Sequence, residues 1–213
     1  MPIDKSLYRE FSSKEDAELW GKKHYGEWAD AYKENMLMLK KIFNSYTWDV
    51  VELYCGFNYW QMNSILRETP DARIFSKDVF KPMIEVLAVI ISWAPRVPEN
   101  IVVYRGVADL FVKKLYDARK KNWWAAEEGF LSTSLCKIIE MDHGYDALLR
   151  IYLPKGVPGA YVPCVTGRAE HELLMPPDSG MRLIDDKPFI LYKICREKIN
   201  GYPVYDCELT YMI

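Results

Sequence analysis

The hydrophobic pattern of this chain changes its period at residues 95–100. Before that segment, apolar residues recur every three or four positions, as on one face of a helix; after it they form short runs typical of strands. The segment carries Pro95 and Pro98, which interrupt a helix and favour extended backbone. The sequence therefore predicts an α+β fold in a single domain over 1–213, with a mainly helical lobe over 1–97 and a β-rich core over 98–213.

The helical half predicts four helices, over residues 13–34, 34–43, 59–67 and 79–93, with a turn over 55–58. The first begins at a serine pair suited to an N-cap. The fourth contains the most apolar segment of the chain, but it is shorter than the ~20 residues that cross a bilayer. We expect it to be a buried core helix, and we expect no membrane span. No secretory signal peptide is visible at the N-terminus, and a soluble protein is expected.

The second half predicts a sheet with one helix inserted over 110–120. The strands are expected over residues 101–105, 130–134, 148–153, 160–162, 172–174, 181–184, 189–194 and 204–209. Trp123 and Trp124 lie outside these runs, where they could form an aromatic patch for a partner. Large aromatics are more often packed inside, so we expect both to lie in the core.

Charge and cysteine usage exclude several classes of function. The net charge is -2, and basic and acidic residues are mixed, so no basic stripe for nucleic acid is present. The five cysteines are scattered, and the three histidines share no metal-ligand spacing. We expect neither a disulfide framework nor a metal site.

Two glutamates, Glu170 and Glu172, stand one residue apart at the start of an apolar run. If this run is a strand, side chains two apart leave the same face, so both carboxylates would point into one site. Alone this pattern is weak, because alternating glutamates are common on solvated strand edges. Two upstream motifs strengthen it: Arg105 at the end of a predicted strand, and Ser132 within Gly129-Phe130-Leu131-Ser132-Thr133-Ser134.

With these three motifs in order, the chain resembles the bacterial mono-ADP-ribosyltransferase toxins of the Arg/Ser/Glu-x-Glu class. These include the binary actin-modifying toxins and the Rho-modifying clostridial exoenzymes. Residues 11–28, 59–67 and 149–162 are also similar to that family, so the resemblance covers nearly the whole chain. It implies a two-sheet mixed or antiparallel β-sandwich with NAD bound as a substrate in a cleft between the sheets. The absence of G-x-G-x-x-G agrees with a site that is not of the Rossmann type.

The resemblance also implies roles for single residues. Glu172 would stabilise the oxocarbenium-like state that forms when the bond to nicotinamide breaks, and Ser132 would hold its rotamer. Glu170 would orient or deprotonate the acceptor. The residues expected to bind NAD are Arg105, Gly106, Ser132, Asn63, Arg67, Tyr59 and Tyr145. Solvated helix positions are the alternative for Asn63 and Arg67, and without the other two motifs Arg105 would be an ordinary surface arginine at a strand end. The turn Thr166-Gly167-Arg168, with Glu170, would recognise the target; residues 140–146 lack the arginine that the family usually has there.

A glutamate rather than a glutamine at position 170 implies an arginine acceptor. A guanidinium is protonated at neutral pH and needs a carboxylate both to bind it and to take its proton. The predicted function is therefore mono-ADP-ribosylation of an arginine on a host protein, with actin as the first candidate. The alternatives are modification of a Rho-type small GTPase, hydrolysis of NAD, and a catalytically silent module that docks onto a translocation component. In each case a secreted or injected bacterial toxin is expected.

Overall fold

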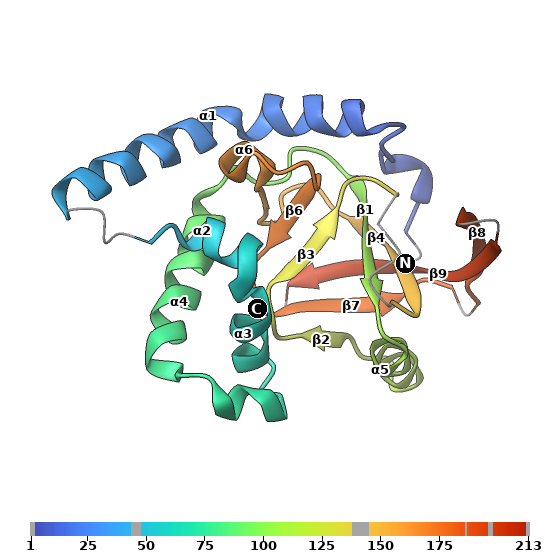
Figure 1. Cartoon of the computed structure of the whole chain (residues 1–213). Helices are drawn as coiled ribbons and strands as arrows, with labels where there is room; N and C mark the ends of the chain where they lie inside the picture. Colours follow the sequence, from blue (N-terminus) through green and yellow to red (C-terminus); the bar gives the residue numbers. More distant parts are fainter. Residues whose placement is uncertain (1–2, 44–47, 138–144, 186, 196–197, 212–213) are drawn as a thin grey trace.

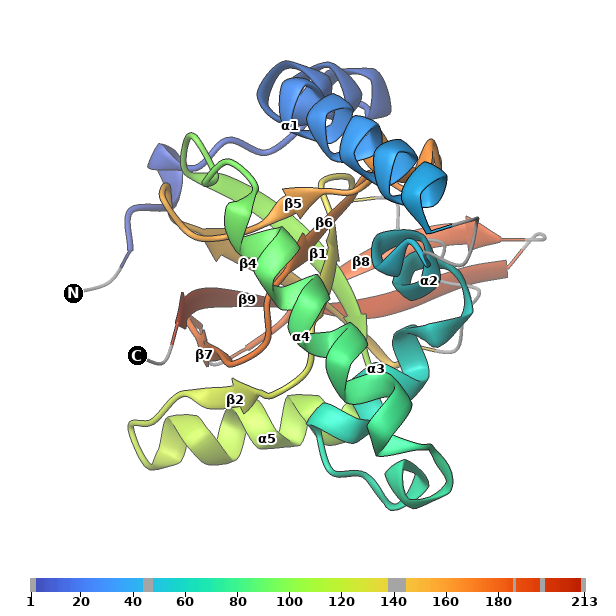
Figure 2. The same cartoon turned by 90° about the vertical axis from the view of Figure 1, so that its left-hand side faces the viewer.

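The computed structural model describes residues 3–43, 48–137, 145–185, 187–195 and 198–211. Helices occupy the chain as far as Trp93, and the first strand begins at Ile101, as the change of period predicts. Helix α1 (Lys14–Ile42) runs along one edge of the molecule and α5 (Asp109–Lys120) along the opposite edge, with the strands between them (Figures 1 and 2). Among the described residues, no helix is both long and apolar enough to cross a membrane.

Helix α1 is longer than predicted. Ser13 caps it, with its side-chain oxygen accepting a hydrogen bond from the backbone nitrogen of Asp16 at 3.1 Å. The two helices expected over 13–34 and 34–43 form one continuous helix, because no glycine or proline interrupts the chain at residue 34. Gly21 allows α1 to approach the sheet, since a Cβ there would lie 2.2 Å from the ring of Tyr161.

Three further helical segments follow α1 and pack beside the sheet (Figure 1). They are α2 (Val50–Leu53) with the π-helical turn η2 (Tyr54–Asn58), α3 (Tyr59–Leu66), and α4 (Lys77–Trp93); short 3₁₀ turns lie at Lys5–Leu7 and Pro70–Ile74. The prediction of a buried core helix is wrong for α4. Ile84, Leu87 and Ile91 are buried, but the opposite face exposes Val86 by 49% and Trp93 by 78%.

Within the described residues, nine strands are hydrogen-bonded in the order β2-β7-β9-β4-β1-β3-β6-β5, with β8 paired to β9. Their bounds are Ile101–Val107 (β1), Ala125–Glu127 (β2), Leu131–Ser134 (β3), Ala147–Leu153 (β4), Ala160–Tyr161 (β5), Glu172–Met175 (β6), Ser179–Leu183 (β7), Phe189–Cys195 (β8) and Lys198–Tyr211 (β9). Strands β4 and β9 pair in parallel, and the other pairs are antiparallel, so the sheet is mixed.

Strand β1 joins the two halves of the sheet, with β2, β7, β9 and β4 on one side and β3, β6 and β5 on the other. It pairs with β4 along its whole length, and it meets β3 through Tyr104 opposite Ser134. The strands form one continuous sheet rather than two separate ones, and in Figure 1 its β3 and β6 run at a steep angle to β7 and β9 on the other side of β1. The site described below lies on both sides of this junction.

The position of the tryptophan pair corrects the sequence prediction. Trp123 is 66% exposed, and Trp124 is half-buried with the Arg182 guanidinium carbon 4.7 Å from its ring centroid. Both precede the short strand β2, which was not predicted because Ala125-Ala126-Glu127 has no alternation of apolar and polar residues.

Candidate active site

Glu172 is the first residue of β6 and lies against β3. Its cross-strand partner is Ser134, and Leu174 is opposite Ser132, so Ser132 and Glu172 are diagonal neighbours on one face. The Ser132 hydroxyl favours the ionised form of the Glu172 carboxyl and so lowers its pKa. Glu172 is 8% exposed. The register of β3 and β6 thus brings Ser132 and Glu172 together on one face of the sheet.

A second donor reaches Glu172 from the helical half. The thiol of Cys55 lies with Sγ 3.6 Å from Oε2 of Glu172. Burial raises the pKa of Glu172 above the ordinary glutamate value, and the charge of Glu170 raises it further; the hydrogen bonds from Ser132 and Cys55 and the charge of Arg105 oppose this shift. Burial also raises the pKa of the Cys55 thiol, so Cys55 acts here as a neutral donor.

Cys55 is not among the predicted site residues, because the residues Cys55-Gly56-Phe57-Asn58 are typical of a turn. They form instead the π-helical turn η2, which continues directly from α2. Such turns are rare and are often found at functional sites. Buried Tyr54, at the start of η2, accepts a hydrogen bond on its hydroxyl from Asn63 at 2.9 Å. The helical half therefore supplies part of the surroundings of Glu172.

Glu170 is not placed by strand geometry as predicted. Strand β6 begins only at Glu172, and His171 has a positive φ of 50°, which turns the backbone between the two glutamates. As a result Glu172 is buried and Glu170 is exposed. The turned backbone is fixed on both sides: the His171 carbonyl accepts from Leu135 at 3.0 Å, and the Glu172 carbonyl accepts from Val162 at 3.2 Å.

The turn that precedes Glu170 is tied to η2. Helix α6 (Pro163–Thr166) ends at Gly167, whose φ of 70° is in the left-handed region that favours glycine. The Arg168 guanidinium donates to the backbone carbonyl of Cys55. Thr166, Gly167 and Arg168, predicted to recognise a target, thus lie beside the helical turn that holds the thiol on Glu172.

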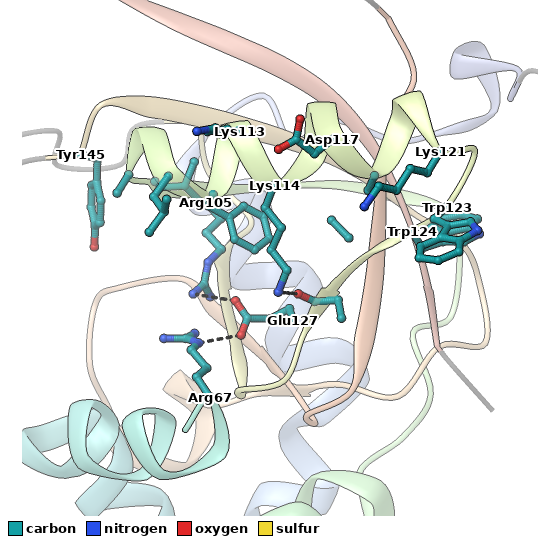
Figure 3. A pocket seen from close by; sticks show the side chains of 18 residues that line it. Arg67, Arg105, Lys113, Lys114, Asp117, Lys121, Trp123, Trp124, Glu127 and Tyr145 are labelled. Atoms are coloured by element: carbon teal, nitrogen blue, oxygen red, sulfur yellow. Dashed lines mark hydrogen bonds and ion pairs between the residues drawn. The ribbon is translucent and has the colours of Figure 1, made fainter. Parts of the chain in front are cut away.

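Arg105 links Glu172 to a second part of the site. Its Nη1 donates to the Ser132 carbonyl at 3.0 Å, and its Nη2 lies 3.7 Å from Oε2 of Glu127. Arg67, from the end of α3, donates from Nε to the other Glu127 oxygen at 2.7 Å. Figure 3 shows the two arginines approaching Glu127 from different sides. Glu127 is 3% exposed and was not predicted, because β2 itself was not predicted.

A pocket of about 1010 Å³ begins at this arginine pair and continues beneath α5 (Figure 3). Its lining includes Gly106 and Tyr145, whose ring would lie 2.3 Å from a Cβ at Gly106. Five cationic and two anionic side chains line it: Arg67, Arg105, Lys113, Lys114, Lys121, Asp117 and Glu127. This excess of positive charge suits a ligand that carries phosphates.

Three residues predicted to bind the dinucleotide lie outside this lining: Asn63, Tyr59, and Ser132, which lies beside Glu172. Asn63 is buried. Its side-chain oxygen accepts a hydrogen bond from the Phe130 backbone nitrogen at 2.8 Å, and its side-chain nitrogen donates one to the Tyr54 hydroxyl. It fixes the chain that leads into β3 rather than facing the pocket. Tyr59 is 54% exposed at the start of α3. Residues 140–144 of the loop before Tyr145 lie outside the described residues, and no group of His, Cys, Asp and Glu in the described part could hold a metal.

Solved structures of several bacterial toxins share this fold. BECa, the ADP-ribosylating toxin of a binary enterotoxin of C. perfringens, determined with NADH, matches 91% of this chain at 20% identity with a TM-score of 0.69. Plx2a, an ADP-ribosyltransferase toxin from Paenibacillus larvae, matches 92% of this chain at 22% identity with a TM-score of 0.65. The Clostridium limosum C3 exoenzyme matches 95% of this chain at 17% identity with a TM-score of 0.62.

The present chain spans 48% of the BECa chain, 96% of Plx2a and 97% of the C3 exoenzyme. Comparison with curated protein sequences gives no significant match. The profile of the family described as ADP-ribosyltransferase exoenzyme matches residues 17–197, from the first turn of α1 to the end of β8. The chain therefore belongs to the ADP-ribosyltransferase exoenzyme family.

Proposed function

We propose that this chain transfers ADP-ribose from NAD to an arginine of a host protein and releases nicotinamide. The proposal rests on the different surroundings of two neighbouring carboxylates. Glu172 is buried and held by Ser132 and Cys55, whereas Glu170 is exposed at the adjoining turn. One carboxylate can therefore act on the dinucleotide while the other meets a second reactant.

The chemistry needs both carboxylates. When the bond between nicotinamide and ribose breaks, nicotinamide leaves with the bonding electrons and positive charge develops on the ribose. The buried Glu172 carboxylate stabilises this charge, which exists mainly in the transition state. A guanidinium nitrogen of the acceptor then bonds to the ribose carbon and loses a proton, which Glu170 accepts.

The pocket beneath α5 supplies the binding of the rest of the dinucleotide. Arg105 and Arg67 present always-charged guanidinium groups that can fork onto phosphate oxygens. Tyr145 and Gly106 adjoin them in the lining. NAD is the substrate in this proposal, and BECa, a relative of the same fold, was determined with NADH.

Actin is the first target we propose, and a Rho-type small GTPase is the second. The carboxylate at position 170 favours an arginine acceptor, as the family resemblance implies. The relatives include a component of a binary toxin and a C3 exoenzyme. Action in the host cytosol, after injection or passage through a separate translocation component, belongs to the same proposal.

Labelled NAD incubated with the protein and with purified actin, a Rho-type GTPase or mammalian cytosol tests this function. We expect nicotinamide release together with label on protein, and mass spectrometry should place the ADP-ribose on an arginine. Nicotinamide release without label on any acceptor would identify an NAD glycohydrolase instead. A silent docking module would not bind NAD, and it would lack the roughly 2.7 kcal/mol of stabilisation expected at a hundred times the dissociation constant.

Removing the Cys55 thiol should change the pH dependence of NAD hydrolysis. Cys55→Ala deletes a donor to the Glu172 carboxylate, so the pKa of Glu172 should rise further and the acid limb of the kcat/KM profile should move to higher pH. Below neutral pH we expect a loss of roughly threefold to tenfold, since a thiol is a weak donor. Cys55→Ser keeps a donor and should retain the parent profile; an alanine variant with the parent profile would show that the contact has no effect.

Replacing Glu127 should weaken the binding of NAD. Glu127→Gln removes the buried charge that holds Arg67 and Arg105, and it leaves two guanidinium groups without their anchor. We expect the KM for NAD to rise roughly tenfold with kcat little changed, and stability to fall by about 2–3 kcal/mol. Glu128→Gln is the matched control, because that neighbouring carboxylate is only half-buried and pairs with Lys114 instead. An unchanged KM in Glu127→Gln would contradict this role.

A further inference from the structure

Phe57 is an aromatic side chain exposed to solvent at the edge of the candidate site. It is 90% exposed, more than any other large apolar side chain in the described part of the chain. It lies within η2, two residues after Cys55. Side chains two apart in a helical turn leave roughly opposite sides, so Cys55 faces Glu172 while Phe57 faces outward. Burial in the protein core therefore does not account for an aromatic residue here.

The same turn adjoins the loop that carries Glu170. The Arg168 guanidinium donates to the Cys55 carbonyl, and its Nη2 would lie 3.4 Å from a Cβ at Gly56, the residue before Phe57. Arg168 and Glu170 are both exposed. The hydrogen bond from Arg168 joins residues 166–170 to residues 55–58, and these two segments are here called the rim of the site.

A protein acceptor must cover more than Glu170. A specific protein interface buries about 800 Å² on each partner, whereas one arginine side chain reaching a carboxylate accounts for only a small part of that area. The surface around the acceptor arginine must therefore meet the rim, and Phe57 stands on it. Tyr59 and Trp60, which follow Phe57 closely in the chain, are two further exposed aromatics, 54% and 47% exposed at the start of α3, and the Trp60 ring lies 4.9 Å from that of Phe75.

We propose that Phe57, supported by Tyr59 and Trp60, anchors the protein that presents the acceptor arginine. The inference rests on the proposed function. The occupant is a folded protein whose arginine lies beside an apolar hollow: the exposed carboxylate of Glu170 attracts the cation, and the hollow takes the Phe57 ring. Exposed aromatics near the centre of an interface commonly contribute most of its binding energy.

Three reactions of the Phe57→Ala variant test the proposal: hydrolysis of NAD, transfer to agmatine as a free guanidinium, and transfer of label to protein in mammalian cytosol. Agmatine needs only the carboxylates, so we expect hydrolysis and agmatine transfer to stay at the parent rates. Labelling of protein should fall by about tenfold to thirtyfold in kcat/KM. Trp93→Ala is the control, an aromatic of similar exposure on α4 that should leave all three reactions unchanged.

The outcomes separate this inference from the function on which it rests. Parent-level labelling of protein by Phe57→Ala would overturn the anchor, as would an equal loss of agmatine transfer, which would place Phe57 in the chemistry instead. A parent enzyme that modifies agmatine but no cytosolic protein would also overturn it while leaving the transfer chemistry intact. A parent that modifies neither acceptor would refute the proposed function itself.

Discussion

Glu172→Gln is expected to lower both nicotinamide release and ADP-ribose transfer by at least roughly 10²–10³-fold. The amide keeps the shape of the side chain but carries no negative charge to oppose the charge that develops on the ribose. Since both reactions pass through the same bond breakage, they should fall together. Nicotinamide release and protein labelling, measured side by side at saturating NAD, check this result, because an effect on kcat indicates an interaction made in the transition state.

The same variant should be more stable than the parent at neutral pH. Burial raises the pKa of Glu172 in the folded state above its ordinary value of 4.5, so the folded state binds this proton more tightly than the unfolded state does. The contribution of Glu172 to stability is therefore full below pH 4.5 and is lost as the pH rises through the folded pKa. A glutamine has no such loss, and the excess Tm of Glu172→Gln should grow with pH.

Melting temperatures of the two proteins across this pH range distinguish a catalytic loss from a folding defect. A glutamine variant that is inactive and also melts below the parent at every pH would show that the activity was lost through the structure. An active glutamine variant would remove Glu172 from the chemistry. Higher stability combined with lower activity is the usual relation at a site where a buried charge serves function at the expense of folding.

The elements that the sequence predicted well are those with a strong period. The helices at α1, α3 and α5 and most strands follow from apolar spacing, and the switch from one period to the other at residues 95–100 marks the boundary between them. Where the apolar pattern is short or continuous, it predicts secondary structure and burial less well. The three residues of β2 contain no alternation, and the apolar run of α4 does not show that one of its faces is left exposed.

The candidate site was predicted only in part, for a related reason. Arg105, Ser132 and Glu172 lie on strands whose register brings them together, and motifs on strands can be found from sequence. Cys55 and Glu127 come from other elements, and their contacts depend on how those elements pack. The relation between the two glutamates depends on one backbone angle at His171, which the period-two argument cannot anticipate.

That turned backbone underlies the second large effect, which is expected for Glu170→Gln. Transfer to arginine should fall by roughly 10²–10⁴-fold, the range attributed to a general base, because an amide can neither take the guanidinium proton nor pair with its charge. Hydrolysis of NAD should continue, since Glu170 is exposed outside β6 and the buried Glu172 keeps its contacts with Ser132 and Cys55. Agmatine transfer and nicotinamide release, measured with the same preparation, check the separation.

The pH profile of NAD hydrolysis distinguishes loss of the Glu170 charge from general damage to the site. The negative charge of Glu170 raises the pKa of Glu172, so its removal should lower that pKa and extend hydrolysis to lower pH than in the parent. Burial, the larger cause of the raised pKa, is unaffected, so the shift should be partial. Equal loss of hydrolysis and transfer, with an unmoved acid limb, would mean that the two carboxylates act as one unit. Separate losses with a shifted limb would assign the dinucleotide to Glu172 and the acceptor to Glu170.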